Sequence, residues 1–143
     1  MLGSPLATLL GLDERTLLVR TGLVAAGGAF GSVARYLVGL ATAEWLGATF
    51  PWGTLTVNVV GSFVIGLLAT LADETGFIGA ESRVLLVVGV LGGFTTFSSF
   101  ALDSLRLVEV HELLRAGLYV AGTMAVSFMA VTGGVALARG LSR

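Results

Sequence analysis

The sequence contains no cysteine, no lysine and only one histidine among its 143 residues. Structural disulfides, thiolate metal sites and histidine clusters for a metal ion are therefore excluded. The eight basic residues are all arginine and nine acidic residues nearly balance them, so no basic patch for a nucleic acid is present. No glycine-rich spacing typical of a nucleotide phosphate loop occurs. We expect a protein that is not an enzyme and that binds neither nucleic acid nor nucleotide.

Charge is scarce because apolar residues fill most of the chain. Hydrophobic residues make up 55% of it and charged residues 12%, and the mean hydropathy is +0.96. Four apolar stretches have about the length, roughly 20 residues, that crosses a bilayer as a helix. They run from about Leu17 to Ala41, Pro51 to Ala72, Arg83 to Leu102 and Leu113 to Ala138. The sequence predicts an all-α multi-pass protein of the cell membrane, with four transmembrane helices and short connections such as Asp103 to Glu112.

Residues 1–20 are interpreted as an N-terminal extension, and residues 21–143 as a single four-helix transmembrane domain. The extension lacks the charged start and the cleavage site of a signal peptide, and either an interfacial helix or a poorly ordered segment is compatible with it. Five arginines are expected on the side of the N-terminus and two or three on the other side. This weak bias favours an N-terminus inside the cell, and it is also what insertion in both orientations requires.

Polar side chains recur at spacings of four on two of the predicted helices, so each set shares one helix face. The sets are Thr54, Asn58 and Ser62 on the second helix and Tyr119, Thr123 and Ser127 on the fourth. Uncharged donors of this kind suit an anion or a row of water molecules. Hydrogen bonds between helices would produce the same pattern. The amide of Asn58 is harder to explain in that way, because it needs several partners at mid-membrane depth.

The third helix contains an unusual segment from Gly89 to Phe100, in which three glycines precede two threonines and two serines. This composition predicts a break near the middle of the helix, and a continuous helix with packing glycines is the alternative. Broken backbone at that depth is tolerated only where protein buries it or a cavity adjoins it. Phe97 and Phe100 follow, three residues apart. Their ring edges can favour an anion, although packing is the ordinary role of such a pair.

Together these segments resemble the Fluc/CrcB family of fluoride channels. The resemblance extends from about Gly22 to Leu137, and it rests on three motifs in order, at residues 27–36, 53–63 and 92–100. It implies an antiparallel, dual-topology homodimer in the lipid bilayer, with two fluoride pores at the dimer interface. The implied function is a fluoride-selective channel that passively exports fluoride and lowers its cytoplasmic concentration.

The resemblance also implies roles for individual residues. The fluoride pathway would include the amide of Asn58, the ring edges of Phe97 and Phe100, and the hydroxyls of Tyr119 and Thr123. Thr123 stands where the family often has serine, which adds a methyl group to a narrow passage.

A structural sodium ion at the centre of the dimer is implied as well. Its ligands would be backbone carbonyls of Gly92 and Thr95. Asp103 occupies a position usually held by glutamate, so no detailed role is assigned to it. Arg35 either stabilises anions near an entrance or fixes the end of the first helix by pairing with carbonyls or with Glu44.

Two other functions are weighed against the channel. A small drug/proton antiporter needs a titratable carboxylate within the membrane, and the first two predicted helices contain no acidic residue between Leu17 and Ala41 or between Pro51 and Ala72. An accessory subunit of a heterodimer would not need a full set of pore residues. Because that set is present, a self-sufficient homodimer is favoured.

Overall fold

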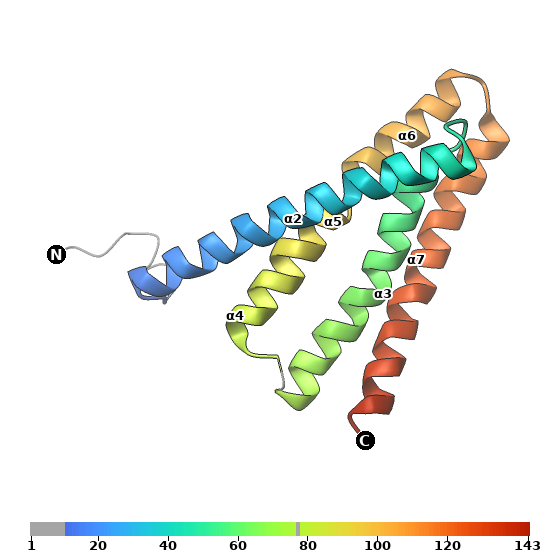
Figure 1. Cartoon of the computed structure of the whole chain (residues 1–143). Coiled ribbons are helices and arrows are strands. Elements are labelled where there is room, and N and C mark those ends of the chain that lie inside the picture. The colour runs from blue at the N-terminus through green and yellow to red at the C-terminus, as the bar shows by residue number, and fades with distance from the viewer. Residues whose placement is uncertain (1–10, 77) are drawn as a thin grey trace.

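The computed structural model describes residues 11–76 and 78–143, and every regular element in this part of the chain is a helix (Figure 1). The helices are α2 (Glu14–Leu46), α3 (Trp52–Thr75), α4 (Ala80–Arg83), the π-helix η1 (Val84–Leu91), α5 (Gly92–Phe94), α6 (Phe97–Glu109) and α7 (Leu113–Leu141). The segments α4 to α6 follow one another as a single long helical unit. Counted in this way, four helices are long and apolar enough to cross a membrane, which confirms the predicted multi-pass architecture.

The first long helix, α2, extends beyond the predicted Leu17–Ala41 at both ends. Asp13 caps its start, because one carboxylate oxygen accepts the backbone N–H of Thr16 at 2.8 Å and the other accepts the Thr16 hydroxyl at 2.7 Å. These bonds, the hydroxyl first, hold the pKa of Asp13 below its usual value, so the ionised cap persists at neutral pH and is lost on strong acidification. Gly47 ends the helix with φ 84°. Residues 1–10 of the predicted N-terminal extension lie outside the described residues.

The third helix continues to Glu109, so the prediction that a connection starts at Asp103 was wrong. Apolar residues continue on one face beyond Asp103, and Leu107 is buried there. The helix stops at His111, which has φ 60°. The backbone N–H groups of His111 and Glu112 donate to the carbonyls of Val108 and Leu107, both at 2.9 Å. A left-handed residue with this pair of bonds is a common way to end a helix.

The third helix is interrupted between α5 and α6. Thr95 (φ −83°, ψ 159°) and Thr96 (φ −155°, ψ 125°) are both extended. The Thr96 hydroxyl then accepts the backbone N–H of Ser99 at 3.2 Å and caps α6. The interruption agrees with the predicted break, but it follows the glycines, and the glycine-containing segment is itself helical. The stretch Val84–Leu91, which includes the first of these glycines, adopts the wider π-helical form, which is often found near functional sites.

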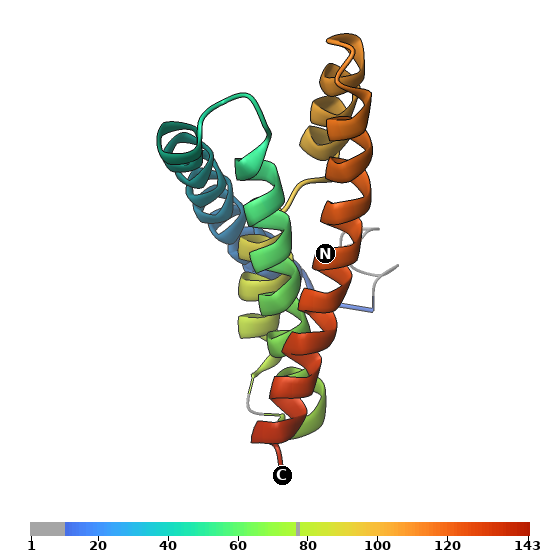
Figure 2. The same cartoon turned by 90° about the vertical axis from the view of Figure 1, so that its right-hand side faces the viewer.

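Two pairs of helices pack most extensively, α3 on α7 and α2 on η1, and Figure 2 shows α3 and α7 side by side. Glycines allow these backbones to meet. A Cβ atom on Gly27 would lie 2.6 Å from the Leu85 carbonyl oxygen, and one on Gly134 would collide with the Phe63 carbonyl. Gly27 and Gly89 therefore pack against each other within one subunit.

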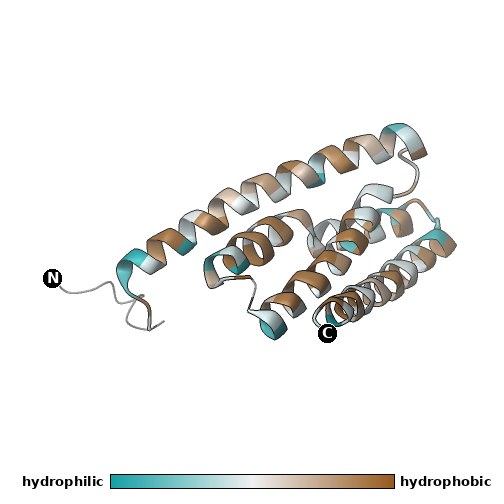
Figure 3. Ribbon diagram, turned by 60° about the horizontal axis from the view of Figure 1, so that its bottom comes forward, coloured by the Kyte–Doolittle hydropathy of each residue, from teal (hydrophilic) through white to brown (hydrophobic). Residues whose placement is uncertain are grey.

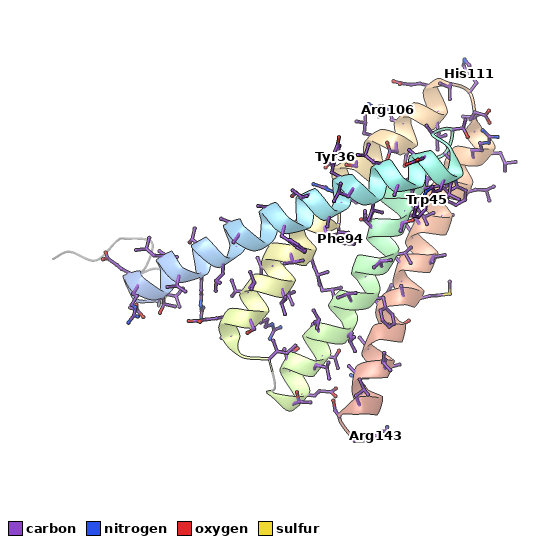
Figure 4. All side chains as sticks on the ribbon, in the orientation of Figure 1. Tyr36, Trp45, Phe94, Arg106, His111 and Arg143 are labelled. Carbon is purple, nitrogen blue, oxygen red and sulfur yellow. The ribbon has the colours of Figure 1, made fainter. Side chains whose placement is uncertain are left out.

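Hydrophobic residues make up most of the long helices, and the most hydrophilic residues lie mainly toward helix ends (Figure 3). His111 and Arg143 lie at opposite ends of the bundle (Figure 4). Near the Arg143 end, ion pairs join Arg83 to Asp73 at 2.6 Å and Arg139 to Glu74 at 3.0 Å. The second pair ties α7 to α3 where both helices reach the membrane surface.

Candidate functional site

Asn58 bonds directly to the interrupted helix. Its Nδ2 donates to the carbonyl oxygen of Thr96 at 2.9 Å, and its Oδ1 accepts the Thr96 backbone N–H at 2.8 Å. Thr96 is buried, with 8% of its surface exposed. The amide of α3 thus satisfies both backbone groups of Thr96, which lies in the break. Sequence reasoning identified the polar demand of Asn58 but missed this partner 38 residues away.

Three hydroxyls on one face of α7 have no such partners. Tyr119 and Thr123 are 0% and 4% exposed. The hydroxyl oxygens of Tyr119, Thr123 and Ser127 are buried, and none has a hydrogen-bond partner in the part of the chain that the structure describes. Buried polar groups are normally paired with protein, water or an ion. This row is therefore a set of donors available to something that the chain itself does not supply.

A cavity of about 460 Å³, here called the central cavity, adjoins this row. It lies between α3, the break and α7, and the residues that line it include Asn58, Ser62, Thr96, Phe97, Phe100, Thr123 and Ser127. The ring centroids of Phe97 and Phe100 are 5.7 Å apart, and that of Phe100 lies 5.2 Å from that of Tyr119. Phe100 is buried, whereas Phe97 is 76% exposed. The structure thus brings all five residues of the predicted pathway to one region, with Phe97 at its outer edge.

Two further cavities lie near the central cavity. The first, called the arginine cavity, holds about 310 Å³, and its polar lining comprises Ser32, Arg35, Tyr36, Thr54, Thr96 and Ser99. The second, called the end cavity, holds about 400 Å³ between the α2–α3 connection and α6, and its polar lining includes Thr42, Thr54, Asp103 and Arg106. Thr96 borders both the central and the arginine cavities, and Thr54 borders both the arginine and the end cavities. Neighbouring cavities thus share lining residues, and the three are here called the row of cavities.

Asp103 lies in this row, at the junction with the end cavity. The Thr54 hydroxyl donates to its Oδ2 at 2.7 Å, and a guanidinium nitrogen of Arg106 lies 3.8 Å from its Oδ1. Only 19% of the Asp103 side chain is exposed. Sequence reasoning assigned no detailed role to Asp103, because the resembled family usually has glutamate at this position, and it placed the residue at the start of a connection. An acid within an apolar helix was the signal that could have identified it.

Arg35 lines the arginine cavity beside the hydroxyls of Ser32 and Ser99. Among the ion pairs and hydrogen bonds of residues 11–76 and 78–143, none joins its guanidinium to Glu44 or to a carbonyl. Pairing with Glu44, one of the two readings of Arg35, is therefore not found. The Arg35 guanidinium thus borders a cavity whose other polar lining residues carry uncharged hydroxyl groups.

The carbonyls of Gly92 and Thr95 lose their usual helical donors at the break. The N–H of Thr96 is directed to Asn58 and not to the Gly92 carbonyl. The N–H of Ser99 is directed to the Thr96 hydroxyl and not to the Thr95 carbonyl. Within the described residues no cluster of three acidic, histidine or cysteine side chains could hold a metal ion. Carbonyl oxygens are hard ligands, so these two groups suit a cation such as sodium.

Comparisons with known proteins show the family of the chain. A family model described as CrcB-like protein, Camphor Resistance (CrcB), matches residues 22–135. A protein of Agrobacterium fabrum (strain C58) named Fluoride-specific ion channel FluC is 51% identical over 124 residues, which cover 87% of this chain and 99% of the relative. Proteins with the same name from Rhizobium etli (strain CFN 42) and Rhodospirillum centenum are 50% and 51% identical over 119 and 116 residues, covering 83% and 81% of this chain and 95% and 92% of those proteins. The chain thus belongs to the CrcB family of multi-pass membrane proteins, whose named relatives are ion channels and not enzymes.

Proposed function

We propose that the chain is a passive, fluoride-selective channel that exports the anion through the row of cavities. The observation that carries the proposal is the set of buried, unpaired hydroxyls on one face of α7, of which Thr123 and Ser127 line the central cavity and Tyr119 lies one turn before Thr123. Its relatives of about 50% identity carry the name of fluoride-specific ion channels. Three of the four buried side-chain polar atoms that lack a partner in the described residues lie on this one helix face, and such a row of donors matches the needs of a travelling anion.

Fluoride is small and strongly hydrated, so a pore that removes its water must replace the lost contacts with closely placed donors. The α7 hydroxyls can donate, and the edges of Phe97 and Phe100 add partial positive charge without a full charge. A line of arginines would bind the anion more strongly but would slow its exit. Two arginines, Arg35 and Arg106, border the row, in the arginine cavity and the end cavity, so positive charge helps entry without lining the central cavity.

The pathway is proposed to be completed by a second copy of the chain in an antiparallel homodimer. The central cavity is open on one side, where Phe97, Met124 and Phe128 are 76%, 59% and 71% exposed. Lipid tails cannot hydrogen-bond to an anion or to the hydroxyls of α7. A second protein surface over this opening would exclude lipid, and two copies would form two pathways.

A sodium ion is proposed at the centre of the dimer, with a structural role. The carbonyls of Gly92 and Thr95 lack their helical donors, and each subunit would supply one such pair. A fixed cation held there would supply positive charge that lowers the cost of nearby anions. It would also tie the broken helices of the two subunits together.

Proton-coupled export is the second candidate. Asp103 is a titratable group within the third apolar helix, and it borders the row of cavities. Carboxylates in membrane helices commonly relay protons. A coupled exporter would depend on a pH gradient, whereas a passive channel would respond only to the fluoride gradient and the membrane potential.

The decisive experiment is fluoride release from liposomes that contain the purified protein. Fluoride is measured with an electrode at equal pH on both sides, valinomycin carries the balancing potassium, and chloride release is the control. Fast fluoride release with little chloride release supports the passive channel. Release only under an imposed pH gradient would favour coupled export, and no release from folded protein would point to a missing partner subunit.

Variants of the two exposed phenylalanines connect the flux to the pathway. Phe97→Ile removes a ring at the edge of the central cavity. It should lower the fluoride flux at least about tenfold, because the contact between the partly positive ring edge and the anion is lost. Phe30→Ile is the matched control, since Phe30 is also exposed (68%) but lies on α2 and borders none of the three cavities. Equal flux in both variants would refute the role of Phe97.

A further inference from the structure

The end cavity contains a pair of opposite charges whose side chains differ strongly in exposure. Asp103 and Arg106 are its only charged lining residues. The Asp103 side chain is 19% exposed and the Arg106 side chain 66%. The cation is thus the outer member of the pair and the carboxylate the inner one. An anion approaching from the surface meets Arg106 first.

Arg106 also retains its hydrogen-bonding capacity. Its nearest guanidinium nitrogen is 3.8 Å from Asp103 Oδ1, which is too long for a hydrogen bond. No hydrogen bond from this guanidinium to another described residue is present, whereas Asp103 directs its second oxygen to Thr54 at 2.7 Å. All of the guanidinium N–H donors therefore stay available to an incoming anion.

Arg106 lies where its free guanidinium N–H groups can act on an anion entering the pathway. Figure 4 shows Arg106 on α6, at the end of the molecule away from Arg143. Thr54 lines both the end cavity and the arginine cavity, and its hydroxyl donates to Asp103. An anion that moves from the end cavity toward Thr54 approaches the Asp103 carboxylate bonded to that threonine, and the negative charge repels it. A cation 3.8 Å from that carboxylate offsets the repulsion.

We propose that Arg106 recruits the anion to the end cavity and offsets the charge of Asp103 at the entrance to the pathway. This inference rests on the proposed channel function. Arg106 is a recruiting and positioning residue, and it does not belong to the inner pathway. Electrostatic recruitment acts over distance, so it raises the rate of entry most when salt is low.

The test compares three variants in the liposome assay, with initial fluoride release measured at low fluoride and at two ionic strengths, about 10 mM and about 300 mM. Arg106→Gln should slow release about threefold to tenfold at low ionic strength and less than about twofold at high ionic strength. Arg106→Lys should restore most of the rate, because it keeps the charge. Arg115→Gln is the matched control, since Arg115 forms a similar pair with Glu112 at 3.6 Å but does not line the end cavity.

The outcomes separate this inference from the proposed function. A wild-type protein that releases no fluoride overturns the channel function and this inference with it. A wild-type protein that conducts, with an Arg106→Gln loss that is the same at both ionic strengths, overturns the recruiting role alone. Equal losses in Arg106→Gln and Arg115→Gln would do so too, because they would show a general effect of surface charge.

Discussion

At the scale of single residues, Asn58 shows how one side chain can lower the free-energy cost of an interruption in a membrane helix. A break at bilayer depth exposes an N–H and a carbonyl group that lipid cannot satisfy. The carboxamide is the neutral side chain that can donate to one and accept from the other, and Asn58 does both toward Thr96. The same amide borders the central cavity, so the group that stabilises the break also lies beside the proposed pathway.

Asn58→Ala should therefore destabilise the protein, because it leaves both backbone groups of Thr96 without a partner. Each unsatisfied buried group costs about 1–3 kcal/mol, so a loss of roughly 2–4 kcal/mol is expected. The measurement is the midpoint of thermal unfolding in detergent, followed by size-exclusion chromatography. Ser62→Ala is the control, because Ser62 lies one turn further along α3 and borders the same cavity. A stability of Asn58→Ala equal to that of Ser62→Ala would show that the amide is not needed at the break.

At the scale of the elements, α2 and η1 form a seam in which backbone meets backbone. A Cβ atom on Gly31 would collide with the Val90 carbonyl oxygen, and one on Gly89 would lie 3.0 Å from the Cα of Gly27. The nearest atoms at Gly27, Gly31 and Gly89 are all backbone, so a change of rotamer cannot make room at these glycines. The seam thus fixes the first half of the broken helix, up to α5, against α2. The break at Thr95 is held between this seam and the bonds from Asn58.

Gly31→Ala should disrupt this seam. Its methyl group has no space and meets backbone, so we expect a loss of about 1–3 kcal/mol, typical of overpacking. Gly22→Ala lies on the same helix with nothing within 4 Å of the added atom, and it should be neutral or stabilising by up to about 1 kcal/mol because alanine favours helices. Thermal unfolding and the yield of monodisperse protein measure both changes. Equal behaviour of the two variants would contradict the seam as a rigid contact.

The sequence predicted the elements better than the contacts between them. Length and hydropathy located all four membrane helices, because the bilayer dictates how long an apolar helix must be. The spacing of three correctly made Phe97 and Phe100 neighbours. The bonds of Asn58 to Thr96 and of Thr54 to Asp103 join residues 38 and 49 positions apart, and no local pattern encodes such partners. The helical continuation past Asp103 was missed because a charged residue was taken as the end of a membrane segment.

At the scale of the whole molecule, the distribution of arginines bears on how the chain enters the membrane. Ion pairs to Asp73 and Glu74 place Arg83 and Arg139 together at one end. Arg106 and Arg115 lie toward the other end, each beside an acid three residues earlier. Neither end has an arginine cluster large enough to fix the orientation strongly. A chain of this kind can supply both members of an antiparallel dimer.

Labelling of single cysteines tests this insertion directly, because the chain contains no cysteine of its own. Ser142→Cys and Ala48→Cys mark opposite ends without changing any charge. If the chain inserts in both orientations, a membrane-impermeant maleimide should label about half of each variant in sealed vesicles, as the weak arginine bias implies. Full labelling after the vesicles are permeabilised is the control for reactivity. Complete labelling of one site and none of the other would establish a single orientation, and the two subunits of a homodimer would then have to be parallel.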